Sequence, residues 1–95
     1  MKMDVTKEAA KWYKEEFNLT DGDTLRFFAR YGGCSNVQKG FSLGVAKEQP
    51  MDVGTKISQE GITFFIEEKD LWYFDGKDLT VAFDQAMNEP IFQID

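Results

Sequence analysis

The feature that most constrains this chain is a series of short segments in which apolar and polar residues alternate. Residues 24–31 are the clearest case, because Leu25, Phe27 and Tyr31 fall on one side of an extended strand. Turn-forming pairs such as Glu60-Gly61 separate the segments. The other strand candidates are 41–46, 51–58, 62–66, 79–83 and 91–94. About six short strands at this spacing predict a sandwich or partly open barrel, mostly antiparallel.

Only one long segment has helical spacing. In residues 5–17, Val5, Ala9, Tyr13 and Phe17 recur every four positions and form one apolar stripe, which we expect to cover a sheet face. Thr6 is the predicted N-cap. We also expect a short helical turn at 71–74 with Asp70 as its cap, and a single domain over residues 1–95, with nine phenylalanines to fill one core. The predicted fold class is mainly β (α+β), with one N-terminal helix.

Charge and composition exclude several classes of function. The net charge is −6, with 11 basic and 17 acidic residues, so phosphate backbones and anionic membranes would repel the chain. No apolar run approaches the roughly 20 residues of a membrane span, and the first residues lack the apolar core of a secretory signal. A lone cysteine cannot form an internal disulfide. We therefore expect a cytoplasmic protein that binds neither nucleic acid nor membrane.

The chain contains no histidine. This removes the commonest general base and every serine–histidine or cysteine–histidine nucleophile pair. We therefore expect a protein that is not an enzyme.

The turn Gly32-Gly33-Cys34-Ser35 interrupts the strand pattern and carries the only cysteine. Two glycines free the backbone and remove side chains that would shield the thiol. The Ser35 hydroxyl and nearby amides could donate to a thiolate, the form that binds soft metals or attacks electrophiles. A lone cysteine is as often an inert apolar filler, so both interpretations stay open here.

Other charged and aromatic residues have weaker signals. Arg26 and Arg30 share a strand face that leads to Cys34. If exposed, they would lower the thiol pKa or bind an anion; if not, they are expected to pair with surface acids, and both alternatives stay open. The aromatic residues are expected mainly in the core. The acidic group near Trp72 offers oxygens that suit hard metals, but we expect a solvated, charged turn there. Its members are Glu67, Glu68, Asp70 and Asp75.

The order of motifs along the chain resembles the HesB-like, A-type iron–sulfur cluster carrier family. Gly33-Cys34-Ser35 precedes a return strand at 41–45, then Leu71 to Gly76, Leu79 and the tail Asn88-Glu89-Pro90-Ile91-Phe92. The resemblance runs from about residue 3 to 94. It implies a compact β fold with a helix and a role in iron–sulfur cluster biogenesis. It also implies that Gly33, Cys34 and Ser35 bind the cofactor, with Cys34 as the metal ligand.

The chain departs from that family in its cysteines. The family's turn cysteine acts with a C-terminal Cys-x-Cys pair, which has no counterpart here. A cluster normally takes four thiolates, whereas one chain offers one and a homodimer two. The resemblance therefore implies iron or a cluster held weakly or shared between chains, with partner proteins of iron–sulfur assembly. Two alternatives stay open. One is a binding module that has lost its metal and meets a protein or small ligand through the aromatic 71–74 segment or an acidic face; the other is a thiol-based sensor that uses Cys34.

Overall fold

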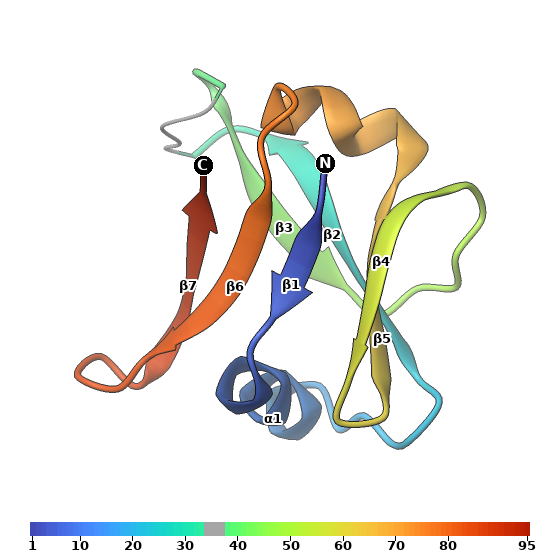
Figure 1. The fold of residues 1–95 in the computed structure, drawn as a ribbon, viewed down its shortest axis with the longest axis vertical. Helices are drawn as coiled ribbons and strands as arrows, with labels where there is room; N and C mark the ends of the chain where they lie inside the picture. Colours follow the sequence, from blue (N-terminus) through green and yellow to red (C-terminus); the bar gives the residue numbers. More distant parts are fainter. Residues whose placement is uncertain (34–37) are drawn as a thin grey trace.

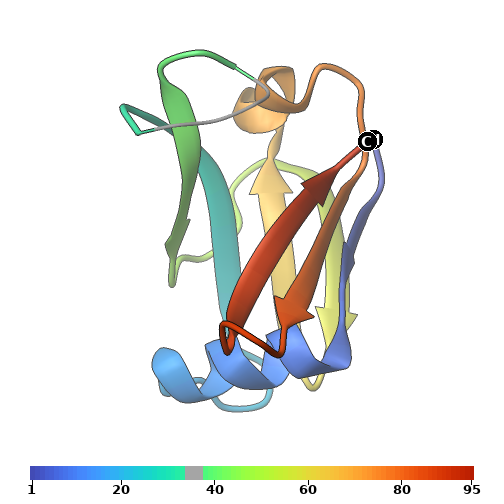
Figure 2. The same ribbon diagram turned by 90° about the vertical axis from the view of Figure 1, so that its left-hand side faces the viewer.

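Seven strands, one α-helix and one 3-10 helix make up the computed structural model, which describes residues 1–33 and 38–95. The strands form two sheets that do not close into a barrel (Figures 1 and 2). The elements are β1 (Met3–Val5), α1 (Lys7–Glu16), β2 (Thr24–Tyr31), β3 (Phe41–Ala46), β4 (Val53–Gln59), β5 (Ile62–Glu67), η1 (Glu68–Phe74), β6 (Leu79–Asp84) and β7 (Glu89–Ile94). The predicted fold class is confirmed.

One sheet has the strand order β1-β6-β7 and the other has the order β3-β2-β5-β4. Three of the five strand pairs are antiparallel, whereas β1 pairs with β6 and β2 with β5 in parallel. Both parallel pairs join strands that are distant in the sequence. Alternation within a strand shows which side chains share a face, but it does not reveal a distant parallel partner.

The first strand, β1, was not among the predicted elements. Residues Met3–Val5 pair with β6, and the Thr6 backbone N–H continues this pairing by donating to the Val81 carbonyl at 2.9 Å. The helix therefore begins at Lys7 and not at residue 5. The predicted N-cap is confirmed, because the Thr6 hydroxyl accepts from the Ala9 N–H at 3.2 Å.

Helix α1 closes one end of the two sheets and does not lie over a sheet face (Figures 1 and 2). Its Tyr13 ring reaches into the core, 5.6 Å from the Phe27 ring and 6.0 Å from the Phe64 ring, measured between centroids. Burial raises the pKa of the Tyr13 hydroxyl. No helix among the described residues is long and apolar enough to cross a membrane.

The core between the sheets is aromatic at its centre. Phe27 of β2 and Phe64 of β5 are fully buried and stack with centroids 6.1 Å apart. From the opposite sheet, the Phe92 ring meets Phe27 edge-on at 5.8 Å. Ring pairs in these geometries stabilise a core beyond the area that they bury.

The 3-10 helix η1 begins at Glu68, so the predicted turn at 71–74 is longer than expected, and Asp70 is not its cap. Asp70 lies inside η1 and bonds Arg26 instead of a backbone N–H. The residue before η1, Glu67, caps nothing with its side chain; its carboxylate accepts from the N–H groups of Met51 and Asp52 at 3.0 and 2.9 Å. Glu67 and Asp70 are both buried and structural, which corrects the expectation of a solvated turn for these two residues. Glu68 and Asp75 are exposed, as expected.

Candidate functional site

The predicted site residues fall in the sequence between β2 and β3, in a connection whose described residues, 32–33 and 38–40, form the tip of the β2–β3 hairpin. Gly32 and Gly33 follow β2 with φ of 101° and 79°, a region that favours glycine, as their pattern predicted. A Cβ on Gly33 would also come within 2.8 Å of the Ser42 hydroxyl oxygen. The other two predicted residues, Cys34 and Ser35, lie outside the described residues, so their roles remain predictions.

Three aromatic rings form a connected cluster near this tip, which we call the aromatic tip and define as Tyr31, Phe41 and Trp72. Tyr31 and Phe41 meet edge-on with centroids 5.6 Å apart, and Phe41 meets Trp72 in the same way at 5.1 Å. Tyr31 is 86% exposed and Trp72 is 50% exposed, unlike the aromatic residues of the core. Rigid aromatic side chains at a surface are typical centres of protein–protein contacts.

The sequence predicted only part of the arrangement of the aromatic tip. The alternation of β2 puts Tyr31 on the same side as Leu25 and Phe27, which are fully buried. Tyr31 is nonetheless exposed because the strand runs past the end of the core. The aromatic segment 71–74 divides similarly, since Tyr73 and Phe74 are buried and Trp72 is not. The signal for the site was an aromatic residue next to a glycine pair, but its contact with Phe41 and Trp72 depends on the fold.

An ion-pair network fastens η1, and with it Trp72, to β2. The Arg26 guanidinium donates to Asp70 at 2.7 Å and to Glu48 at 3.1 Å, and it lies 5.3 Å from the centre of the Phe28 ring. Burial acts to lower the pKa of Arg26, but the hydrogen bonds and charges of Asp70 and Glu48 outweigh it and raise this pKa. Among described buried side-chain atoms, the Arg26 Nε alone has no hydrogen-bond partner.

This network decides between the two alternatives for Arg26, which pairs with acidic residues. The Arg26 side chain forms ion pairs with Asp70 and Glu48 and is largely buried. Arg30, on the same strand, is exposed near the tip. Arg30 thus remains the better candidate for attracting an anionic group to the hairpin tip.

The donor set can be compared with the needs of an iron–sulfur cluster. A cluster takes four ligands, mostly thiolates. The whole sequence holds one cysteine and no histidine, and the described part of the chain contains no group of three side chains of the metal-binding types. A single chain therefore does not fit a resident cluster, whatever the geometry at Cys34.

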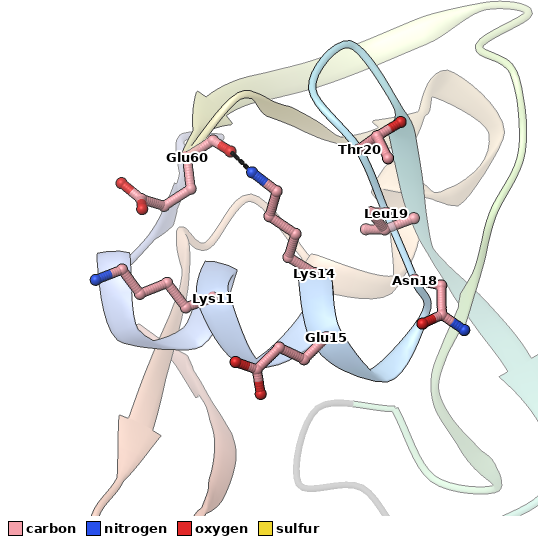
Figure 3. A pocket seen from close by; sticks show the side chains of 7 residues that line it. All are labelled: Lys11, Lys14, Glu15, Asn18, Leu19, Thr20 and Glu60. Carbon is pink, nitrogen blue, oxygen red and sulfur yellow. Dashed lines mark hydrogen bonds between the residues drawn. The ribbon is translucent and has the colours of Figure 1, made fainter.

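A surface hollow of about 610 Å³ lies between α1, the segment that follows it and the β4–β5 turn. Within it, Lys14 donates to the Glu60 carbonyl at 3.2 Å (Figure 3). Lys14 also donates to Asp21 at 2.8 Å. Lys11 and Glu15 extend from the same helix without pointing toward each other (Figure 3). Lys14 is held by Asp21 and Glu60, and Lys11 and Glu15 diverge, so the hollow offers no convergent site.

The family model described as iron-sulphur cluster biosynthesis matches residues 1–95. This chain belongs to that family. The HesB-like resemblance found in the motif order is thereby confirmed, and membership relates the protein in general terms to iron–sulphur biogenesis.

Two relatives and one solved structure add detail. The chain is 58% identical over 93 residues to the pyruvate dehydrogenase inhibitor of Bacillus subtilis, covering 98% of each chain. It is 36% identical over 92 residues to an uncharacterized protein of Staphylococcus saprophyticus, covering 94% of each. A solution NMR structure of an Aquifex aeolicus protein matches with a TM-score of 0.57 and 23% identity, covering 98% of this chain and 89% of that one. That last likeness concerns the fold alone.

Proposed function

We propose that this protein binds and inhibits pyruvate dehydrogenase, as a protein-binding member of its family and not as an enzyme. The observation that carries the proposal is the 58% identity, over 98% of both chains, to a protein that bears the name pyruvate dehydrogenase inhibitor. The ligand chemistry supports it, because one thiol per chain suits a cluster carrier poorly.

The aromatic tip is the surface that we assign to this binding. Tyr31 and Trp72 offer large rigid rings at the surface. Arg30, which precedes Tyr31 in β2, and Lys39, two residues before Phe41, are also exposed. Truncating a central aromatic residue of an interface typically costs more than tenfold in affinity. Arg26 and Asp70 support the surface from below, because they fix η1 against β2.

The test measures inhibition of purified Bacillus subtilis pyruvate dehydrogenase complex, followed as NADH formed from pyruvate, coenzyme A and NAD⁺. We expect the parent protein to inhibit in a concentration-dependent manner. The double variant Tyr31→Ser/Trp72→Ser should require at least about tenfold more protein for the same inhibition. Met87→Ser is the matched control, since Met87 is 66% exposed and lies in the distant β6–β7 turn.

Two results would count against the proposal at different levels. If the parent protein leaves the complex fully active at a large molar excess, the proposed function is wrong. If the parent inhibits and the Tyr31/Trp72 variant inhibits equally well, the function stands and the binding surface lies elsewhere.

The second candidate function is iron or cluster delivery through Cys34, with Gly33 and Ser35 beside it. Family membership over residues 1–95 favours it, and ligands from a partner protein or a second chain would have to complete the site. It predicts that anaerobically supplied iron and sulfide give thiolate charge-transfer absorbance that Cys34→Ser abolishes. Equal absorbance in the serine variant would exclude Cys34 as the ligand. A protein acting in either way is expected in the cytoplasm.

A further inference from the structure

Two strands border an open side of the molecule. In the sheet orders, β3 ends one sheet and β7 ends the other. The remaining end strands, β1 and β4, lie in contact, and the Gln59 side chain donates to the Val5 carbonyl at 3.2 Å across them. The sheets are therefore joined on one side and open on the other, where Figures 1 and 2 show β3 and β7. Figure 2 turns this open side toward the viewer.

The hydrogen-bond pattern shows which backbone groups of β7 face the open side. Asp78 and Asp95 exchange backbone bonds of 3.0 and 3.2 Å, so they form a hydrogen-bonded pair of the antiparallel ladder. Because such pairs alternate, the outward-facing residues of β7 are Pro90, Phe92 and Ile94. Proline has no N–H to offer, and it is tolerated at an edge position of this kind.

The same reasoning applies to β3. The Gly32 N–H donates to the Gly40 carbonyl, in register with the β2–β3 ladder. Alternation from this pair directs the backbone groups of Phe41, Leu43 and Val45 to the open side. Both strands have six residues, and both present three outward-facing positions.

The charges that flank these strands are complementary. Lys39 and Lys47 lie on either side of β3, whereas Glu89 begins β7 and Asp95 follows it. Residues 24–47 contain no acidic residue, and residues 78–95 contain no basic one. Pairing β3 with β3, or β7 with β7, would bring like charges together, so only a β3–β7 pairing is favoured. Lys47 lies 3.5 Å from Asp23 on the surface, and exchanging such a partner costs little.

We propose that two copies of this chain form a two-fold dimer in which β3 of each copy pairs with β7 of the other. The two strands run in opposite directions in Figure 1, so a two-fold axis parallel to the strands makes both pairings antiparallel. Placing Leu43 opposite Phe92 sets Ala46 opposite Glu89 and Gly40 opposite Asp95, so Lys47 and Lys39 each lie one position along the chain from the residue that faces an acidic side chain. Each pairing then lacks only the bond that Pro90 cannot donate.

The side chains agree with this alignment. Leu43 packs against the core, and the Phe92 ring contacts Phe27, so both point to the core side of their strands. Residues opposite each other in one continuous sheet must share a face. Phe92 is 39% exposed in the single chain, and the dimer would cover it.

Light scattering on a sizing column, at about 0.1 mM protein and low salt, tests the dimer. We expect a mass twice the 10.9 kDa of one chain. Lys39→Glu/Lys47→Glu and Glu89→Lys/Asp95→Lys should each weaken association at least about tenfold, because each makes both edges alike in charge. An equimolar mixture of these two variants should again give dimers, since each supplies the charge that the other lacks. Lys7→Glu/Lys11→Glu, on exposed helix positions, is the matched control.

A monomeric parent protein at this concentration would overturn the proposal. So would reversal variants that dimerise as the parent does, or a mixture that stays monomeric. The proposal is independent of pyruvate dehydrogenase inhibition, because a monomeric parent that still inhibits would remove the dimer alone.

Discussion

The two ends of this molecule use aromatic rings in opposite ways. At the α1 end, Tyr13 is 4% exposed and joins Phe27 and Phe64 in the core. At the aromatic tip, Tyr31 is 86% exposed and touches only the rim of the fold through Phe41. The comparison separates residues that hold the structure from residues available for binding, although both are tyrosines in apolar patterns. Substitutions at the α1 end should therefore mainly lower stability, whereas substitutions at the aromatic tip should mainly weaken inhibition.

The largest loss of stability is expected at the helix end. Tyr13→Ala removes a buried ring that contacts four others, namely Trp12, Phe17, Phe27 and Phe64. We expect the free energy of unfolding to fall by about 3–4 kcal/mol, measured by urea denaturation. A loss below about 1 kcal/mol would show that the helix end is not packed as described.

The next largest effect is expected in the network that supports the tip. Asp70→Ala removes one carboxylate partner of the largely buried Arg26, whose own Nε already lacks a hydrogen-bond partner. We expect a loss of about 2–4 kcal/mol in the free energy of unfolding, together with weaker inhibition as η1 loosens. Replacing both charges, as Arg26→Met/Asp70→Leu, should cost less than Asp70→Ala alone. If the double variant is less stable than Asp70→Ala, the ion pair itself stabilises the fold, and the loss in Asp70→Ala is not due mainly to an unpaired buried charge.

A smaller, pH-dependent effect is expected at the turn after α1. The hydrogen bond from the Thr20 N–H and the charge of Lys47 lower the pKa of Asp23 below its ordinary value of 3.8. The charged form is therefore favoured in the folded state, and its stabilisation is present above pH 3.8 and lost as the pH falls through the lowered pKa. Asp23→Asn should flatten the loss of stability in this acid range, as followed by thermal unfolding. An unchanged acid profile would contradict this assignment.

The smallest effect on stability is expected at Tyr31. Tyr31→Ala should change the free energy of unfolding by less than about 0.5 kcal/mol, because the side chain is almost fully exposed. Its effect on inhibition of pyruvate dehydrogenase should be large by comparison. A variant that unfolds much more easily than the parent would place Tyr31 with the structural residues and remove the contrast between the two ends.

The sequence alone was sufficient for the elements whose signals are local. Alternation predicted the strand at 24–31 with its observed bounds, and the Thr6 cap marked the start of α1 within two residues. The left-handed backbone at Gly32 and Gly33 followed from their position at a turn, since glycine adopts it without cost. Each of these features depends on residues that are neighbours along the chain.

Tertiary structure decided what depends on residues far apart. A three-residue strand such as β1 is too short for a pattern, and it exists because β6 supplies its hydrogen bonds. Asp70 was expected to cap a helix, but Arg26, 44 residues away, holds its carboxylate. Alternation placed Tyr31 on the same side of its strand as Leu25 and Phe27, but Tyr31 is exposed because the core ends before the strand does. Local periodicity determines which way a side chain points, whereas only the packed fold determines what stands opposite it.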